Sequence, residues 1–193
     1  MNDFRSNFIN YFPRISKREY ERKIYDAINS AGGSDNYIDY NETHDYTFAM
    51  YGFINESKKL LANKNYESSF DIIESILDSI LNTSIDDSDG STGEIANDCI
   101  EIIEDILGCS LIDDDKIPIR ILNYLLDEVK TQNLYNYGIE TYFLLNYFID
   151  ENKYIDEIKT ALSSYIDIHK EDNHCWNINN YNKLLDKIMV NNE

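Results

Sequence analysis

Apolar residues recur every three to four positions along most of this 193-residue chain. The stretch from Tyr66 to Ile80 is an example, because Phe70, Ile73 and Leu77 have the spacing that places side chains on one face of an α-helix. Strict alternation of apolar and polar residues, which is typical of half-buried strands, is absent. We therefore expect an all-α fold.

Short polar or glycine-containing segments separate the helical stretches, and such short connections predict antiparallel hairpins. We expect one domain over residues 1–193, with seven to eight helices in helical-bundle or TPR-like packing and a flexible segment over 30–42. The expected helices cover 16–29, 44–62, 66–81, 91–107, a stretch from just after 115 to 131, 138–150, 154–169 and 178–191, with a short helical segment over 3–12 before them.

Two of these helices begin with the capping-box pattern Ser-x-x-Glu. Ser16 pairs with Glu19 in the first, and Ser91 pairs with Glu94 in the second. Gly108 is expected to end the second helix, because glycine readily adopts the left-handed backbone conformation found after helix C-termini. These residues set the expected boundaries of the two helices.

The helices over 66–81 and 91–107 carry the same row of carboxylates opposite their apolar residues. Each row has spacings of four, three and four residues, and no Lys or Arg interrupts either row. Like charges at these spacings destabilise a helix by about a few tenths of a kcal/mol per pair, so the rows suggest a function. A hairpin could join them into one acidic surface, and the expected partner-binding residues are then Glu67, Asp71, Glu74, Asp78, Glu94, Asp98, Glu101 and Asp105. The alternative is that both rows are solvated faces of amphipathic helices.

The charge of the chain is concentrated in its middle third. The formal net charge is −19, and residues 61–115 contain one basic residue, Lys64, against 15 Asp and Glu. A negative field of this kind repels nucleic acid and anionic membrane, and it attracts basic proteins or cations. We therefore expect a basic protein partner, no direct nucleic-acid binding and no membrane binding. A homodimer is also compatible with this charge distribution, because a basic N-terminal patch of one copy could contact the acidic rows of another.

The cysteine content and the N-terminal sequence favour a cytoplasmic protein. Cys99, Cys109 and Cys175 make an odd number without a Cys-x-x-Cys pair, which argues against a disulfide framework. The N-terminal residues lack the apolar stretch of a signal peptide, and the richest apolar run, 142–149, is too short to span a membrane.

Two stretches resemble known helical families. Residues 54–80, with Tyr66-Glu67-Ser68-Ser69 at the start of the second helix, resemble a tetratricopeptide helical hairpin. More widely, residues 50–193 resemble the helical region associated with bacterial SWIM-type zinc-finger proteins, through the run NYESSFDIIESIL, the loop DDSDG, the run NLYNYGIE and a late Trp176. The zinc ligands of the finger itself, Cys-x-Cys and Cys-x-His, are absent. The resemblance implies a helical adaptor scaffold without the zinc site.

Metal binding has two weak candidates. Asp86, Asp87 and Asp89 precede Gly90, but a calcium loop aligned on this glycine would need a ligand where Ala96 stands. Turn formation and helix capping explain the same aspartates. The second candidate has His169, His174 and Cys175 within seven residues, but the pair of cysteines typical of a structural zinc site is missing.

Catalytic motifs are absent: the sequence contains no G-x-G-x-x-G or P-loop pattern, and His44-Asp45 has no accompanying nucleophile. We therefore expect no catalytic residues and no cofactor. The leading hypothesis is a non-enzymatic acidic binding protein that engages a basic protein, as an inhibitor, an immunity protein or a nucleic-acid mimic. The alternatives are a helical scaffold or adaptor that binds through an apolar groove, and a divalent-metal-dependent enzyme that uses the Asp loops.

Overall fold

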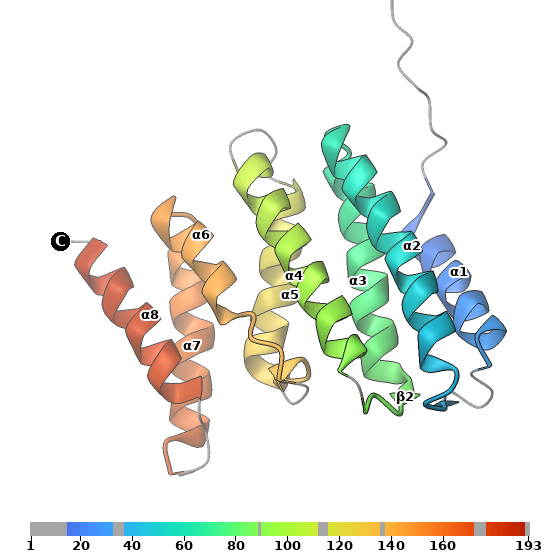
Figure 1. Cartoon of the computed structure of the whole chain (residues 1–193). Coiled ribbons are helices and arrows are strands. Elements are labelled where there is room, and N and C mark those ends of the chain that lie inside the picture. Colours follow the sequence, from blue (N-terminus) through green and yellow to red (C-terminus); the bar gives the residue numbers. More distant parts are fainter. Residues whose placement is uncertain are drawn as a thin grey trace, which may run out of the picture.

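The computed structural model describes residues 15–32, 37–88, 90–111, 116–135, 138–171 and 177–191. The helical segment expected over 3–12 lies outside these residues. The described part is all-α, as the sequence predicted, apart from one small pair of strands (Figure 1). Its elements are α1 (Lys17–Ser30), β1 (Tyr37–Ile38), α2 (Thr43–Ala62), α3 (Tyr66–Asn82), β2 (Ser84–Ile85), α4 (Ser91–Ser110), α5 (Lys116–Thr131), a 3-10 turn (Tyr142–Leu144), α6 (Leu145–Asp150), α7 (Ile155–His169) and α8 (Asn177–Asn191).

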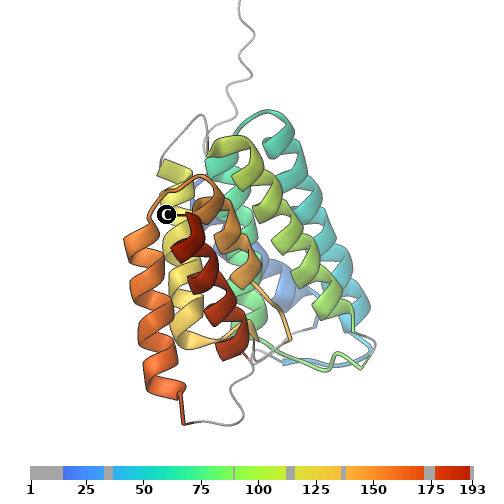
Figure 2. The same ribbon diagram turned by 90° about the vertical axis from the view of Figure 1, so that its left-hand side faces the viewer.

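The helices form two layers that follow the chain from α1 at one end to α8 at the other (Figures 1 and 2). One layer contains α2, α4, α6 and α8, and the other contains α1, α3, α5 and α7. Neighbours within a layer pack together, as α1 does with α3 and α2 does with α4. The hairpin expected over 54–80 is formed by α2 and α3, whose connection turns at Lys64 with a φ of 60°. Because α3 packs against α1, α2 and α4, it is the most enclosed of these four helices.

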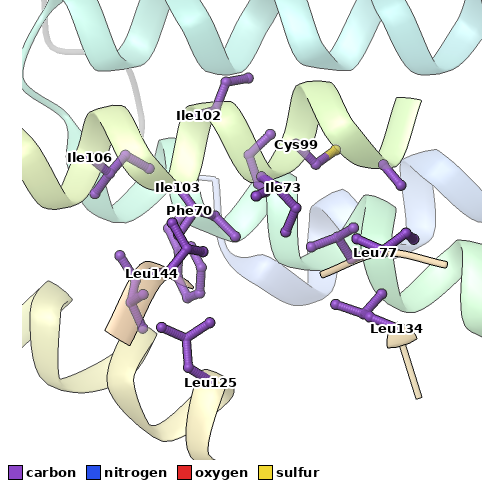
Figure 3. Close-up of a cluster of buried hydrophobic side chains, with 14 of the residues drawn as sticks. Phe70, Ile73, Leu77, Cys99, Ile102, Ile103, Ile106, Leu125, Leu134 and Leu144 are labelled. Atoms are coloured by element: carbon purple, nitrogen blue, oxygen red, sulfur yellow. The ribbon is translucent and has the colours of Figure 1, made fainter. Parts of the chain in front are cut away.

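Isoleucine and leucine side chains fill the space between the layers. Figure 3 shows Phe70 and Ile73 of α3 packed against Ile103 of α4, with Leu125 of α5 and Leu144 closing the cluster. All five are at most 1% exposed. Each such side chain stabilises the fold by about 1.5–3 kcal/mol relative to an exposed position, so this shared core joins the central helices.

Several helix ends differ from the expected ones. Asp87, and not the box of Ser91 and Glu94, caps α4: its Oδ2 accepts a hydrogen bond from the Thr92 N–H at 3.1 Å. Gly108 does not end α4, which continues to Ser110, because an exposed glycine with an ordinary backbone can remain helical. The box expected at Ser16 is also absent, since its side chain makes no capping hydrogen bond.

The region expected as a helix over 138–150 contains only the 3-10 turn and the six-residue α6. The segment expected to be flexible, 30–42, contributes β1 and a hydrogen-bonded turn, while residues 33–36 lie outside the described part. β1 pairs with β2 in parallel, with Ile38 opposite Ile85. Two-residue strands are too short to give a pattern of alternation, which explains why the sequence did not reveal them.

Candidate functional site: two acidic helix faces

The carboxylates in the middle of the α3 row, Asp71 and Glu74, face neighbouring helices. Asp71 is 3% exposed, and its Oδ1 lies 2.5 Å from a guanidinium nitrogen of Arg120 on α5. The same guanidinium also binds Glu74. Burial lowers the pKa of Arg120, but the hydrogen bonds and charges of Asp71 and Glu74 outweigh this effect and leave it raised. Arg120 therefore neutralises the middle of this row.

A second cation covers the end of the α3 row. The Nζ of Lys17 on α1 lies 3.0 Å from Glu74 and 2.9 Å from Asp78, and it is 3.6 Å from Glu21 on its own helix. Burial raises the pKa of Asp78, and Lys17 only partly offsets this rise. The expectation of a row that faces water is wrong for Asp71 and Glu74, which α1 and α5 cover, whereas the Asp78 side chain remains 39% exposed.

The carboxylates of α4 have a different environment. Glu94, Glu101 and Asp105 are exposed and Asp98 is half-buried. Within the described parts of the chain, no Lys or Arg lies within 4.0 Å of these four carboxylates. We call this set of four the α4 acidic face. Its charges are compensated by solvent and not by the fold.

Tyrosines from the two neighbouring helices of the layer flank the α4 acidic face. Tyr147 of α6 donates a hydrogen bond to Glu104 of α4 at 2.8 Å. Burial, followed by Glu104, raises the pKa of Tyr147 to about 12. On the other side, burial raises the pKa of Tyr51 of α2, with smaller contributions from Asp98 and Glu94. Both phenols remain neutral at physiological pH, so they can act as hydrogen-bond donors beside the carboxylates.

The two rows therefore do not form one acidic surface. Of the α3 row, Asp71, Glu74 and Asp78 bind Arg120 or Lys17, and Glu67 is half-buried in the first turn of the helix. The α4 row lies in the other layer and keeps its charges unpaired within the described residues. The four residues of α4 are therefore the predicted partner-binding residues whose charges stay unpaired within the described residues, and their role in binding remains a prediction.

Sequence reasoning missed the two cations that neutralise the α3 row. One signal for Arg120 was present: it lies three residues after Ile117 and four before Tyr124, at the edge of the apolar stripe of its helix. A charged residue in that position is seldom buried unless it is paired. No comparable signal marked Lys17, which lies in a polar first turn.

The metal candidates are only partly described. The Oδ1 of Asp86 accepts a hydrogen bond from Ser88 at 2.8 Å, and Asp87 caps α4; Asp89 lies outside the described residues. His169 packs against Tyr165 with ring centroids 4.4 Å apart, while 174 and 175 lie outside the described part. Over the residues that the structure describes, no three His, Cys, Asp or Glu side chains are grouped so that they could hold a metal ion.

Comparisons with protein-family models, with curated proteins and with solved structures found no match to this chain. Among the described helices, none combines the length and the apolar character that crossing a membrane requires.

Proposed function

We propose that this protein is a non-enzymatic binding protein that engages a basic protein partner through the α4 acidic face. The contrast between the two rows supports the proposal. The fold supplies Lys17 and Arg120 to the α3 row but no cation to the α4 row, within the described residues. Unpaired like charges at helical spacing are mildly unfavourable for α4, and a basic partner would turn this cost into attraction.

The surroundings of the α4 acidic face fit a protein interface. The row extends over about 16 Å at 1.5 Å per residue, which matches a small recognition patch. Tyr51 and Tyr147 flank it, and Phe48, three residues before Tyr51 on α2, is 77% exposed. Aromatic side chains are frequent anchors at the centres of interfaces. The combination offers both long-range attraction and short-range apolar contact.

In its concrete form, the proposal is an inhibitor or immunity protein that occupies the nucleic-acid-binding surface of a basic effector. A straight row of single negative charges on a rigid helix presents to such a surface what a nucleic-acid backbone presents. The free thiols of Cys99 and Cys109 support a cytoplasmic location as part of this proposal.

The experiment is capture of binding partners from the native host at low salt, with the wild-type chain and two variants. The first variant carries Lys at Glu94, Asp98, Glu101 and Asp105. The second is a matched control with the same change of net charge, and it carries Lys at four exposed acidic positions on other elements, namely Asp127, Glu151, Asp167 and Asp186.

A basic protein that is retained by wild type and by the control, and lost from the α4 variant, is the expected result. Duplex DNA or RNA should displace it if the protein mimics nucleic acid, and half-molar salt should weaken the complex because the Debye length is then only about a few Å. Equal capture by both variants would refute a role for the α4 acidic face.

A scaffold that binds through an apolar groove is the second candidate. It is favoured by the two-layer arrangement of successive hairpins, since stacked helical hairpins commonly present extended binding surfaces (Figure 1). Binding that persists in half-molar salt and in both charge variants would support the scaffold over the acidic binding protein.

A further inference from the structure

The two rows of carboxylates have the same residue types in the same order, and each contains a central Asp and Glu three positions apart. On α3 this central pair is Asp71 and Glu74, and on α4 it is Asp98 and Glu101. Side chains at this spacing are neighbours on a helix surface, with their Cβ atoms about 5–6 Å apart. The two pairs therefore have the same local geometry, and a group that fits one pair also fits the other.

The structure shows which group the α3 pair binds. The guanidinium of Arg120 bridges the pair, because it donates from one nitrogen to Asp71 and from another to Glu74. The guanidinium also lies over the aromatic ring of Phe70. A planar guanidinium has several N–H donors in a fixed arrangement, whereas a lysine ammonium acts as a point charge. The Asp-x-x-Glu pair is thus a guanidinium site within this fold.

The α4 pair has the same carboxylates without the cation. Among the residues that the structure describes, no Lys or Arg lies within 4.0 Å of Asp98 or Glu101. Glu101 is exposed and Asp98 is half-buried, so a side chain of another molecule can reach both. An aromatic residue is also near this pair, because burial and then Asp98 raise the pKa of Tyr51 on the neighbouring α2 (Figure 1). The α4 pair therefore repeats the surroundings of the α3 pair on an open surface.

We propose that the α4 acidic face recognises an arginine side chain of the partner protein, which bridges Asp98 and Glu101 as Arg120 bridges the α3 pair. This inference rests on the function proposed above and adds the identity of the recognised group. Arginine is favoured over lysine because its guanidinium donates to both carboxylates at once and is more weakly hydrated, so it loses less when the interface excludes water. The outer carboxylates of the row then contribute attraction without this selectivity.

The test uses alanine-rich peptides that carry four cationic residues at the spacing of the α4 row. One peptide carries arginine at these positions and a second carries lysine. A third carries asymmetric dimethylarginine, which keeps the charge but has one terminal nitrogen that cannot donate. NMR titration of the amide signals at low salt measures binding. The arginine peptide should bind at least about tenfold more tightly than the other two, with its largest shifts near Asp98 and Glu101.

Two double variants, each with one Asp→Asn and one Glu→Gln change, separate the central pair from general attraction. Asp98→Asn with Glu101→Gln should abolish the preference for arginine. Glu94→Gln with Asp105→Asn is the matched control, because it has the same net charge and lies on the same face. Its two positions are about 16 Å apart along the helix, so one guanidinium cannot bridge them. The control should bind all the peptides more weakly and retain the preference for arginine.

The outcomes separate this inference from the function on which it rests. Equal binding of the arginine and lysine peptides would overturn the inference and leave an acidic face that attracts any cation. A preference that persists in the central double variant, or that the dimethylarginine peptide shares, would also overturn it. Absence of saturable binding by every peptide would overturn the inference as well, while the capture of partners from the host would still test the proposed function.

Discussion

The guanidinium group of Arg120 donates a hydrogen bond to Asp71, a carboxylate that is 3% exposed in the face of α3. The same group lies over the ring of Phe70, 5.0 Å from its centroid. Arg120 thus connects α5 to α3 by charge and by apolar contact. This relationship explains why the α3 row of carboxylates contributes to the packing of the helices.

Replacement of Arg120 by Ala should destabilise the protein strongly. It leaves the buried carboxylate of Asp71 without its cation, and the loss of one member of a buried pair costs about 3–5 kcal/mol. Because the Arg120 side chain is 30% exposed, we expect a value near the lower end. Urea unfolding followed by circular dichroism measures the change.

The control for Arg120→Ala is Arg22→Ala, which removes the same side chain from an exposed position on α1. It should change the free energy of unfolding by less than about 0.5 kcal/mol. Similar effects of the two substitutions would mean that the pairing of Arg120 with Asp71 contributes little to stability.

Neutralising the two rows should have opposite consequences. The chain offers a matched pair of triple variants, each with two Asp→Asn changes and one Glu→Gln change. These are Asp71, Glu74 and Asp78 on α3, and Asp98, Glu101 and Asp105 on α4. The α3 variant leaves Arg120 without Asp71 and Glu74, leaves Lys17 with only its 3.6 Å contact to Glu21, and should lose about 3 kcal/mol or more. The α4 variant removes only mutual repulsion and should be unchanged or slightly more stable.

The free energies of unfolding of both triple variants can be compared with wild type in one set of urea titrations at low salt. A large loss of stability in the α4 variant would show that the α4 acidic face has a structural role, and it would weaken the proposed function.

The two rows of carboxylates show which features of the structure the sequence could predict. Helical spacing predicted correctly that Asp71 and Glu74 share one face of α3, since that relationship is local. It could not predict what covers this face, because Lys17 and Arg120 are separated from it by tens of residues in the chain. The position of Arg120 at the edge of an apolar stripe was the one available signal. The α4 row gave the same local pattern and differs only through its neighbours.

The helix ends illustrate the same limit. The start of α4 was predicted at Ser91, which is correct, but the cap was assigned to Ser91 and Glu94 when the loop in fact delivers Asp87 to the Thr92 N–H. A cavity beside this cap also escaped prediction. Its walls come from Ile80, Ile85 and Ile139, and no local pattern indicates that these segments meet.

Glu128 should make stability depend on pH in the acidic range. Burial raises the pKa of this residue above its ordinary value of 4.5 in the folded state. Between the ordinary and the raised pKa, the folded protein holds a proton that the unfolded chain has lost, so stability should fall as the pH rises through this interval. Above the raised pKa the contribution stays constant, because both states are then ionised.

The measurement is the difference in unfolding free energy between wild type and Glu128→Gln as a function of pH. The amide oxygen of Gln can still accept the Leu134 N–H, which binds Glu128 at 2.9 Å. Relative to this variant, wild type should lose stability above about pH 4.5. Asp167→Asn, at an exposed position on α7, serves as the control. A pH-independent difference for Glu128→Gln would contradict the prediction.

Phe148 and Phe48 form a matched pair for the core. Phe148 of α6 is fully buried, whereas Phe48 of α2 is 77% exposed. Phe148→Ala should lower stability by about 3–5 kcal/mol through lost burial and a residual cavity. Phe48→Ala should leave stability nearly unchanged and, under the proposed function, should weaken partner binding. Thermal unfolding measures the first effect. A Phe148→Ala variant that is as stable as wild type and Phe48→Ala would show that the short α6 does not depend on the packing of Phe148 against the core.

Asp87 and Ser16 both precede a helix, but only the side chain of Asp87 makes a capping hydrogen bond. Asp87→Ala removes the acceptor for the Thr92 N–H and for the Ser91 hydroxyl, so it should destabilise the start of α4 by about 1 kcal/mol. Ser16→Ala should cost much less, because the Ser16 side chain makes no capping hydrogen bond to α1. Hydrogen exchange can resolve the two helix starts separately. Faster exchange of the Thr92 amide in Asp87→Ala, without a matching change at Glu19 in Ser16→Ala, is the expected result. Faster exchange at Glu19 in Ser16→Ala, with no change at Thr92 in Asp87→Ala, would contradict the prediction and support the capping by serine that the sequence suggested.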